Sequence, residues 1–349
     1  MTQRLEYIDA LRGFTMILVV LAHIINIGYH ITDSTMEEMN TFNNLFVRFR
    51  MPLFFFISGF VFYKHERIWD GKTVKSFIHR KFIVQIIPTI IFFFLFCFLN
   101  GGKYVERLGE MKAGYWFTIT LFEFFVFIAL FSFFLKRRRI KNDILMLGFA
   151  LILYLVGSAY RFYQLRGDDI WALNFLGVIH WRFYIFFILG TLVKKYFASF
   201  CRLVENQYIS ATIIVLMIMI NVVISRFFPI HTYNTITFIL QGVLGIIIVF
   251  IFFRHYQESF RCNRFMGKWL QYIGRRTLDI YLLHYFFLPK NMEDLGEFFL
   301  RHSNPVIEFG VSLFLALLVI VICLVVSNII RLSPFLAHCL FGTKHISNL

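Results

Sequence analysis

Residues 7–30 read YIDALRGFTMILVVLAHIINIGYH, and in this stretch Arg12 and His23 bracket ten residues without a charge. A bilayer core of about 30 Å requires about 20 predominantly apolar residues in a helix. The stretch is too long for a secretory signal, lacks a small-residue cleavage site and carries an ionisable residue at its centre. It therefore predicts a membrane span rather than a cleaved signal peptide.

Similar apolar segments recur along the rest of the chain. We therefore expect an all-α integral membrane protein, a bundle of about ten transmembrane helices with both termini in the cytoplasm. A single membrane domain over residues 1–349 is expected, with no appended soluble domain. The ten segments lie near 13–30, 46–63, 82–99, 113–135, 144–160, 174–193, 208–228, 235–253, 273–289 and 307–330.

The overall composition excludes a water-soluble fold. Of the 349 residues, 59% are hydrophobic, 48 are phenylalanine and only 16% are charged. Soluble globular chains carry roughly 45–50% apolar and about 25% charged residues. The same composition excludes a disordered, coiled-coil or collagen-like chain. The net charge of +15 does not indicate a nucleic-acid partner, because the basic residues adjoin the spans and no binding module accompanies them.

The positions of the basic residues predict the orientation. With a cytoplasmic N-terminus and alternating loops, 24 of the 35 Lys and Arg fall in the inner segments and 11 fall elsewhere. Cytoplasmic loops carry such an excess, which supports an even number of spans. These inner segments are 1–13, 63–81, 136–143, 194–207, 254–276 and 331–349.

Arg12 and His23 form the strongest candidate site. They are 11 residues apart, just over three helical turns, so both lie on one helix face about 16 Å apart along the axis. Asp9 precedes Arg12 by three residues and shares its side of the helix. Ionisable groups inside spans mark functional sites by default. The alternative is a structural histidine that bonds a neighbouring hydroxyl or carbonyl group.

Glu123 is a second ionisable residue in an apolar segment, about ten residues into the predicted span 113–135. A carboxylate at that depth is costly unless it is paired. Two interpretations therefore remain open: a structural pair with Arg182 or Arg50, and a role in catalysis.

Other polar residues within spans have structural explanations. Asp279 and His284 are five residues apart and point in different directions, so structural hydrogen bonding is expected for both. Ser58 and Gly59 are small residues that permit close helix packing. The five cysteines show no CxxC spacing, and no His, Asp and Glu set has ligand spacing, so neither a disulfide framework nor a metal is expected.

Six sequence blocks follow one another along the chain: IDALRG and LVVLAH, PLFFFISGF at 52–60, YWF at 115–117, FFILG at 186–190 and LDIYLLH at 278–284. In this order they resemble the membrane acyltransferase 3 family, the multi-span O-acyltransferases of bacterial surface glycans. They extend over nearly the whole chain. One position departs from the pattern: Gln85 stands three residues before Pro88, where many members carry an arginine, so no donor-phosphate contact is assigned there.

The resemblance implies transfer of an acyl group, with acetyl expected, from cytoplasmic acyl-CoA (acetyl-CoA) to a hydroxyl of a cell-surface or lipid-linked saccharide. The location implied is the bacterial cytoplasmic (inner) membrane, and no metal is implied. His23 would be the general base or a transient acyl carrier. The implied roles are catalytic for His23, Glu123 and Asp9, donor-binding for Arg12, Arg80, Lys81 and Ser58, and acceptor-binding for Arg50, Trp116, His180, Arg182, Tyr281 and His284.

A transporter or flippase for lipid-linked sugars is the alternative function. Ten spans, central ionisable groups and basic inner loops are also expected in that class. The sequence contains no repeated half and no matching pair of interrupted helices, which disfavours a transporter. Consumption of acyl-CoA by the purified protein, without a second compartment, would distinguish the two functions.

Overall fold

The computed structural model describes residues 5–31, 46–64, 68–109, 111–135, 142–227, 236–302 and 304–343. Within these ranges the chain is helical and forms no strand. The acidic segment 32–44 and the basic run 136–141 lie outside the described residues. Six of the described helices are long and apolar enough to cross a membrane: Glu6–Gly28, Gly71–Leu99, Trp116–Leu135, Asp143–Leu165, Thr237–His255 and Pro305–Ile330.

The prediction of an all-α membrane protein is confirmed, whereas the count of ten spans stays a prediction. A seventh span results if the broken pair Val178–Lys195 and Phe197–Val204 counts as one. The shorter apolar helices Arg50–Phe62 and Gln207–Ile220 fall within the predicted second and seventh segments. The predicted ninth segment contains an 11-residue helix, Thr277–Phe287.

Contacts divide the chain into two compact units. Unit 1 comprises Met1–Ile57 and Tyr196–Val325, and unit 2 comprises Ser58–Lys195 and Val326–Leu349. Helices α4 (Arg50–Phe62) and α18 (Pro305–Ile330) contribute to both. The remaining elements of unit 1 are α1 (Glu6–His23), the π-helical turn η1 (Ile24–Gly28), α12 (Phe197–Val204), α13 (Gln207–Phe227), α14 (Ile236–His255), α15 (Phe265–Arg275), α16 (Thr277–Phe287) and α17 (Glu293–Arg301).

Unit 2 contains the helices between the two chain segments of unit 1, together with a short C-terminal helix. Its elements are α5 (Gly71–Lys81), the π-helical turn η2 (Phe82–Ile86), α6 (Ile87–Leu99), α7 (Tyr104–Gly109), η3 (Met111–Gly114), α8 (Trp116–Leu135), α9 (Asn142–Leu165), α10 (Trp171–Leu176), η4 (Val178–Phe183), α11 (Tyr184–Lys195) and α19 (Pro334–Phe341).

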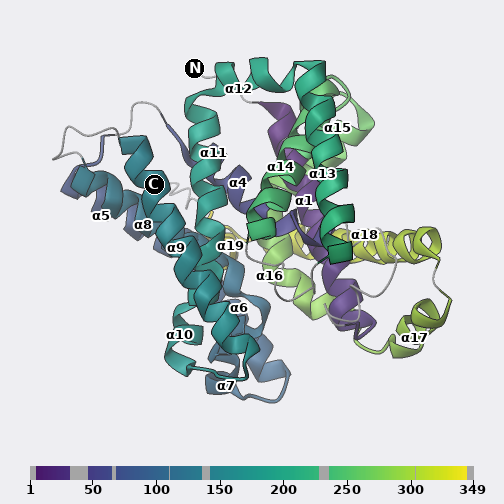
Figure 1. The fold of residues 1–349 in the computed structure, drawn as a ribbon. Coiled ribbons are helices and arrows are strands. Elements are labelled where there is room, and N and C mark those ends of the chain that lie inside the picture. The colour runs from purple at the N-terminus through teal and green to yellow at the C-terminus, as the bar shows by residue number, and fades with distance from the viewer. Residues whose placement is uncertain are drawn as a thin grey trace. The chain divides into compact units, whose positions relative to one another are not determined.

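In unit 1, α1 is the central helix and packs against α14, α15 and α16 (Figure 1). Most of its side chains are buried. Aromatic contacts join it to α14, where Tyr7 meets Phe250 at 5.9 Å and Phe14 meets Phe253 at 5.5 Å between ring centroids. Because α1 carries Arg12 and His23, this packing brings both candidate residues to contacts between helices of unit 1.

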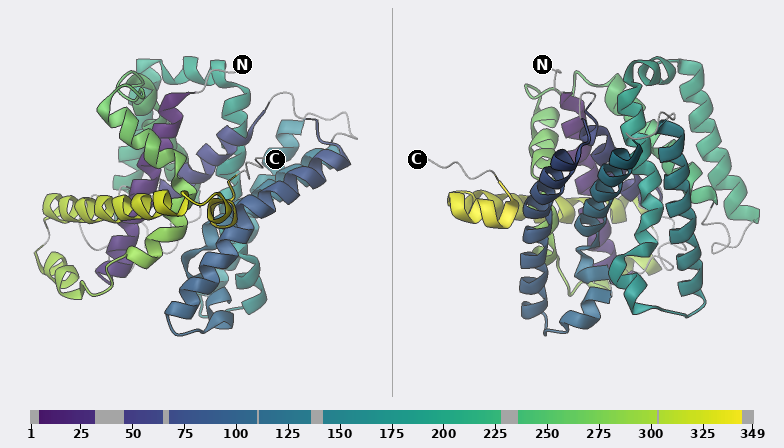
Figure 2. Two further views of the ribbon diagram at one scale, coloured as in Figure 1. Left: turned by 180° about the vertical axis from the view of Figure 1, so that it is seen from behind. Right: turned by 90° about the vertical axis from the view of Figure 1, so that its left-hand side faces the viewer.

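In unit 2, α8 and α9 form a helix layer with α11, and α5 packs on α8 (Figure 2). Phenylalanine fills the contact, since Phe62, Phe77, Phe125 and Phe187 have ring centroids 5.5–5.9 Å apart in successive pairs. Edge-to-face pairs of this kind add to the free energy of burial. The phenylalanine-rich composition therefore builds the helix interfaces as well as the outer surface.

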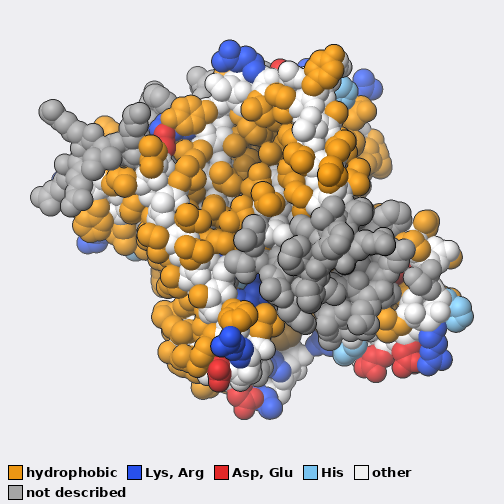
Figure 3. Space-filling model, viewed as in Figure 1, with side chains coloured by type: hydrophobic (Ala, Val, Ile, Leu, Met, Phe, Trp, Pro, Cys, Tyr) orange, Lys and Arg blue, Asp and Glu red, His pale blue; other side chains and the backbone are white. Residues whose placement is uncertain are grey.

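The outward faces of several helices are apolar. Figure 3 shows hydrophobic side chains over α9, α11 and α13. On α13, Ile218 and Met219 are 59% and 54% exposed, and on α9 Ile152 is 59% exposed. Apolar helix faces of this kind are unfavourable in water and suit contact with lipid.

Candidate active site

Helix α1 runs in the same direction as the α15–α16 pair, and two contacts along it join residues with the same separation in sequence. Gly13 lies beside Gly274, and His23 lies beside His284, and both pairs are 261 residues apart in the chain. A Cβ on Gly13 would overlap the carbonyl oxygen of Leu270, and a Cβ on Gly274 would overlap that of Asp9. The absence of side chains at these two positions thus allows the two backbones to touch. This contact determines which side chains of α1 and α16 face each other farther along the helices.

Arg12 lies at the N-terminal end of this helix contact. Its Nη2 donates a hydrogen bond to Thr277 Oγ1 at 3.1 Å. The carboxylate of Asp9 lies 3.9 Å from Arg12 Nη1 and 3.9 Å from Arg275 Nε. About 20 Å of helix axis separates Asp9 from His23. In this structure the carboxylate of Asp9 lies beside two guanidinium groups, and its catalytic role stays a prediction.

His23 belongs to a chain of hydrogen-bonding groups at the other end of the contact. His284 Nε2 lies 3.0 Å from His23 Nδ1, and the Tyr285 hydroxyl lies 3.2 Å from His23 Nε2. His284 Nδ1 lies 3.1 Å from the carbonyl oxygen of Ile280, which can only accept, so Nδ1 carries the proton. In the neutral form of both rings, His284 Nε2 accepts from His23 Nδ1. This leaves His23 Nε2 as an acceptor, bonded by the Tyr285 hydroxyl.

The two groups that bond His23 are more deeply buried than His23 itself. His284 and Tyr285 are 0% and 4% exposed, whereas His23 is partly accessible. Arg50, predicted near the acceptor, lies close enough to His23 to act on it electrostatically. Tyr281 packs against the ring of His284 at 5.8 Å between centroids. Unit 1 therefore brings three other predicted residues close to the imidazole of His23 or to its partner His284.

A π-helical turn begins directly after His23, at Ile24. Such turns insert an extra residue into an α-helix and are frequent at functional sites. In this chain the turn changes the direction of the side chains that follow His23, while the α-helical part of α1 keeps His23 in register with His284.

A second polar cluster lies within unit 2, where η4 meets the start of α8. The rings of Trp116 and His180 stack at 3.9 Å with an interplanar angle of 17°. The space above Gly177 is bordered by His180, by Lys112 Nζ and by Thr120 Oγ1. The predicted acceptor residues Trp116 and His180 are therefore in contact.

Glu123 also belongs to this part of unit 2, where a tryptophan contacts its carboxylate. Trp181 Nε1 donates to Glu123 Oε2 at 3.1 Å. Among the residues described in unit 2, no ion pair joins Glu123 to Arg182, whose guanidinium instead lies 5.1 Å from the ring of Phe183. The reason is helical geometry: Trp181 and Arg182 are neighbours in η4, so only one of them can face α8.

Lys112 is an unexpected member of the unit 2 cluster. It is 4% exposed, and its Nζ donates to the carbonyl oxygen of Asn174 at 3.1 Å. Lys112 and Ala113 both have left-handed backbone angles, φ 53° and φ 51°, a conformation that costs energy for residues other than glycine. Burial lowers the pKa of the Lys112 ammonium, and the nearby Glu123 partly offsets that shift.

The predicted donor residues of unit 2 occupy α5 and α4. Arg80 is exposed, and Lys81 Nζ lies 3.8 Å from the ring centroid of Phe125. Ser58 precedes Gly59, whose backbone touches that of Phe187 so closely that a Cβ would overlap it. The predicted close packing of the small residues is thus observed.

The residue that departs from the family pattern has a structural role. Gln85 is buried in the π-helical turn η2, and its Nε2 donates to the carbonyl oxygen of Thr118 at 2.7 Å. Thr89 Oγ1 bonds both the Gln85 carbonyl, at 2.7 Å, and Thr118 Oγ1, at 2.9 Å. Gln85 therefore joins the third predicted span to α8. Among the described residues, no group of three His, Cys, Asp or Glu could hold a metal ion.

Comparison with known proteins identifies the family of this chain. The family model described as an acyltransferase domain matches residues 5–325, nearly the whole chain. The chain belongs to the acyltransferase 3 family. No curated protein and no solved structure matches it. The protein is thus a membrane acyltransferase, and the matched range includes both polar clusters.

Several polar residues of this acyltransferase's two clusters were not predicted. Tyr285 follows His284 directly and bonds His23, and Trp181 follows His180 directly and bonds Glu123. Lys112 stands just before the YWF block. All three residues lie next to the motifs of the sequence analysis, which is a signal of a functional role. That signal is weak, because a chain with 20% aromatic residues often has one beside a motif.

Proposed function

We propose that this acyltransferase moves an acyl group, acetyl in the first instance, from cytoplasmic acyl-CoA to a hydroxyl of a cell-surface or lipid-linked saccharide at the bacterial cytoplasmic membrane. The observation that carries the proposal is the state of His23. Its Nδ1 is committed to His284, and its Nε2 is the accepting nitrogen, already bonded by a hydroxyl group. An imidazole in this tautomer is suited to accept a proton from an alcohol.

In the proposed reaction the acceptor hydroxyl takes the place of the Tyr285 hydroxyl at His23 Nε2. As the acceptor oxygen attacks the thioester carbonyl, its proton passes to Nε2. The carbon–sulfur bond breaks, an ester bond forms, and the proton on Nε2 passes to the leaving thiolate, which gives the free thiol of CoA. A variant of this route forms an acyl-imidazole at Nε2 first and transfers the acyl group afterwards.

The remaining residues bind the two substrates. In unit 1 Arg12 would neutralise donor phosphates, and in unit 2 Arg80 and Lys81 supply positive charge suited to the same groups. Trp116 and His180 present stacked aromatic faces of the kind that pack against sugar rings, and Glu123 would accept a hydrogen bond from an acceptor hydroxyl. The predicted topology, with ten spans and both termini in the cytoplasm, would bring the donor to the N-terminal end of α1.

The direct test uses His23→Ala in purified full-length protein, with acetyl-CoA and an acceptor glycan fraction. We expect the rate of CoA thiol release to fall by about 10³-fold, within the range for loss of a general base, while the protein remains folded in detergent. Full activity in this variant would contradict the assignment of His23.

Two further measurements separate the alternatives. Mass spectrometry of the surface glycans of cells with and without the gene should detect an acyl mass that depends on it. Consumption of acetyl-CoA in detergent, without a second compartment, is incompatible with a protein that only transports. Isolation of a labelled acyl-protein after a single turnover would favour the acyl-imidazole route over direct attack.

A further inference from the structure

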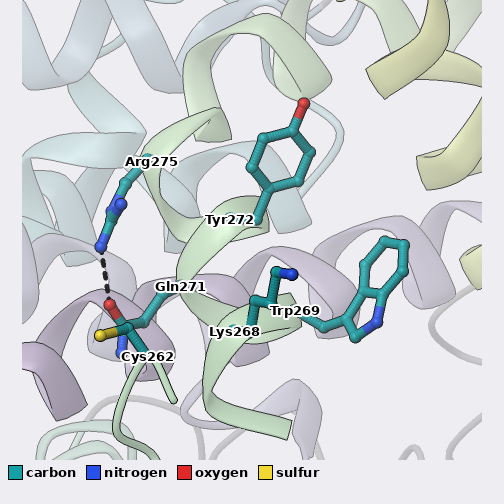
Figure 4. A pocket seen from close by; sticks show the side chains of 6 residues that line it. All are labelled: Cys262, Lys268, Trp269, Gln271, Tyr272 and Arg275. Carbon is teal, nitrogen blue, oxygen red and sulfur yellow. Dashed lines mark hydrogen bonds between the residues drawn. The ribbon is translucent and has the colours of Figure 1, made fainter. Parts of the chain in front are cut away.

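A pocket of about 370 Å³ lies on α15, in unit 1 (Figure 4). Its volume falls within the range of small-molecule sites, about 300–1,000 Å³. Figure 4 shows Arg275 and Gln271 on one side, Trp269 and Tyr272 on the other, and Lys268 between them. The lining residues are Cys262, Lys268, Trp269, Gln271, Tyr272 and Arg275.

The cationic side of the pocket is held in place by buried polar groups. Gln271 is 1% exposed, and its Oε1 accepts from Arg275 Nη2 at 2.7 Å. Its Nε2 donates to the carbonyl oxygen of Phe260 at 2.8 Å. Glu6 Oε2 accepts from the backbone N–H of Cys262 at 2.8 Å, which fixes the loop at the rim. Arg275, which lines the pocket, is thus anchored through its Nη2 to Gln271.

The other side supplies a free cation and aromatic surface. In the part of the chain that the structure describes, the Lys268 ammonium forms no hydrogen bond or ion pair. Trp269 is 47% exposed, and Tyr272 lies three residues later on the same helix. The segment 254–276 contains six Lys and Arg against one acidic residue, Glu258. An anion with a planar ring fits this combination of cations and aromatic faces.

The pocket is also connected to the candidate active site through the helix register. The Nε of Arg275 lies 3.9 Å from the carboxylate of Asp9, and Asp9 precedes Arg12 by about one helical turn. From Arg12 onward, α1 and α16 run side by side as far as His23 and His284. The axial distance from Asp9 to His23 is about 20 Å. The flexible arm of CoA, with about a dozen bonds between phosphate and sulfur, spans roughly 15 Å when extended like a peptide chain, and its diphosphate adds to that reach.

We propose that the α15 pocket binds the nucleotide end of the donor, a purine nucleoside carrying phosphates, with Lys268 and Arg275 as phosphate ligands and Trp269 and Tyr272 as the surface for the base. The inference rests on the proposed function, because the nucleotide is the non-reacting end of acyl-CoA. The phosphates would lie next to Arg12, and the arm would follow α1 toward His23.

The test measures binding of adenosine 3′,5′-bisphosphate, which has no acyl arm, to the full-length protein in phosphatidylcholine nanodiscs. Lys268→Gln and Arg275→Gln should each weaken binding about tenfold, the change that follows from 1.4 kcal/mol. Arg264→Gln is the matched control, because it removes an exposed charge four residues before Lys268 that does not line the pocket. The affinity of Arg264→Gln for adenosine 3′,5′-bisphosphate should match that of the wild type.

The outcomes separate the pocket from the reaction. Unchanged nucleotide affinity in both pocket variants, with thermal stability retained, would overturn the proposal. The proposal would also be overturned if the same variants lost phosphatidylglycerol binding without any change in nucleotide affinity. In that case the pocket would be a site for a lipid headgroup. If the wild-type protein binds the nucleotide, the variants do not, and the wild type never consumes acetyl-CoA, the pocket is supported and the proposed function is contradicted.

Discussion

The imidazole of His23 derives its chemical state from two neighbours that lie far from it in the sequence. His284 fixes which nitrogen carries the proton, because its own Nδ1 is bound to a backbone carbonyl. Tyr285 occupies the nitrogen that remains. A third group that orients a base is a recurrent arrangement in enzymes that activate hydroxyl nucleophiles. His284 is accordingly a positioning residue, and His23 is the group that meets the substrate.

This assignment predicts the behaviour of His284 variants. His284→Ala should lower kcat by about 10²-fold or more, because His23 loses the acceptor that selects its tautomer. KM for acetyl-CoA should stay within about twofold, since no donor contact is removed. His284→Gln, whose side-chain oxygen can accept from His23 Nδ1, should recover part of the rate. The measurement is steady-state thiol release.

Tyr285→Phe serves as the control for that series. It removes a hydroxyl from the other imidazole nitrogen and keeps the ring that packs at 4.1 Å from His284. We expect this variant to keep most of the activity, because the acceptor hydroxyl replaces that of Tyr285 in the reaction. A loss as large as that of His284→Ala would instead make Tyr285 part of the proton path.

Helix α1 and the α15–α16 pair depend on glycine for their contact. The backbones touch at Gly13 and Gly274. The relative position of the helices at this contact brings Arg12 to Thr277 and His23 to His284. A similar contact joins Gly59 to Phe187 in unit 2. Lipid provides no hydrophobic force between helices, so close approach through small residues is a main source of their association.

Gly13→Ala and Gly274→Ala are therefore expected to be strongly destabilising. Each methyl group would overlap a backbone carbonyl that cannot move without displacing its helix, a cost of about 1–3 kcal/mol or more. Gly148→Ala and Gly310→Ala are matched controls, since nothing lies within 4 Å of a Cβ at either position. Thermal unfolding in detergent should show lower Tm for the first two variants only. Equal Tm values in all four would refute the proposed contact.

The distribution of charge over the whole chain bears on its orientation. Basic residues gather in segments that alternate with the predicted outer loops, and the positive-inside rule relates that pattern to the cytoplasm. The pattern belongs to the full sequence and involves both units. It predicts that the loop before α15, like the N-terminus, faces the donor.

The native cysteines allow this orientation to be measured. Cys262 is exposed, whereas Cys97, Cys201 and Cys323 are buried and Cys339 is partly buried. A membrane-impermeant maleimide should label Cys262 in inverted inner-membrane vesicles and not in intact spheroplasts. Lys103→Cys, between α6 and α7, should show the reverse pattern. Labelling of Cys262 from the outer side would reverse the assigned topology and place the α15 pocket away from acyl-CoA.

Some features of this protein follow from the sequence alone, because they depend on local or additive physics. Apolar length and composition predict membrane helices, and the 3.6-residue period places Arg12 and His23 on one face of α1. The family blocks are likewise read in order along the chain. The hydrogen bond from Trp181 to Glu123 could not be predicted in this way, because it depends on the orientation of η4 against α8, which no local pattern contains.

The identity of the residues around His23 was decided by tertiary structure. His284 and Tyr285 reach it across about 260 intervening residues, through the backbone contact of two glycines. Likewise, Lys112 reaches Asn174 only because two residues adopt left-handed angles before α8. Helical periodicity states which side chains share a face, but packing between helices depends on the shapes of both surfaces at once. That is why the sequence located the imidazole, and only the folded chain revealed the groups that control it.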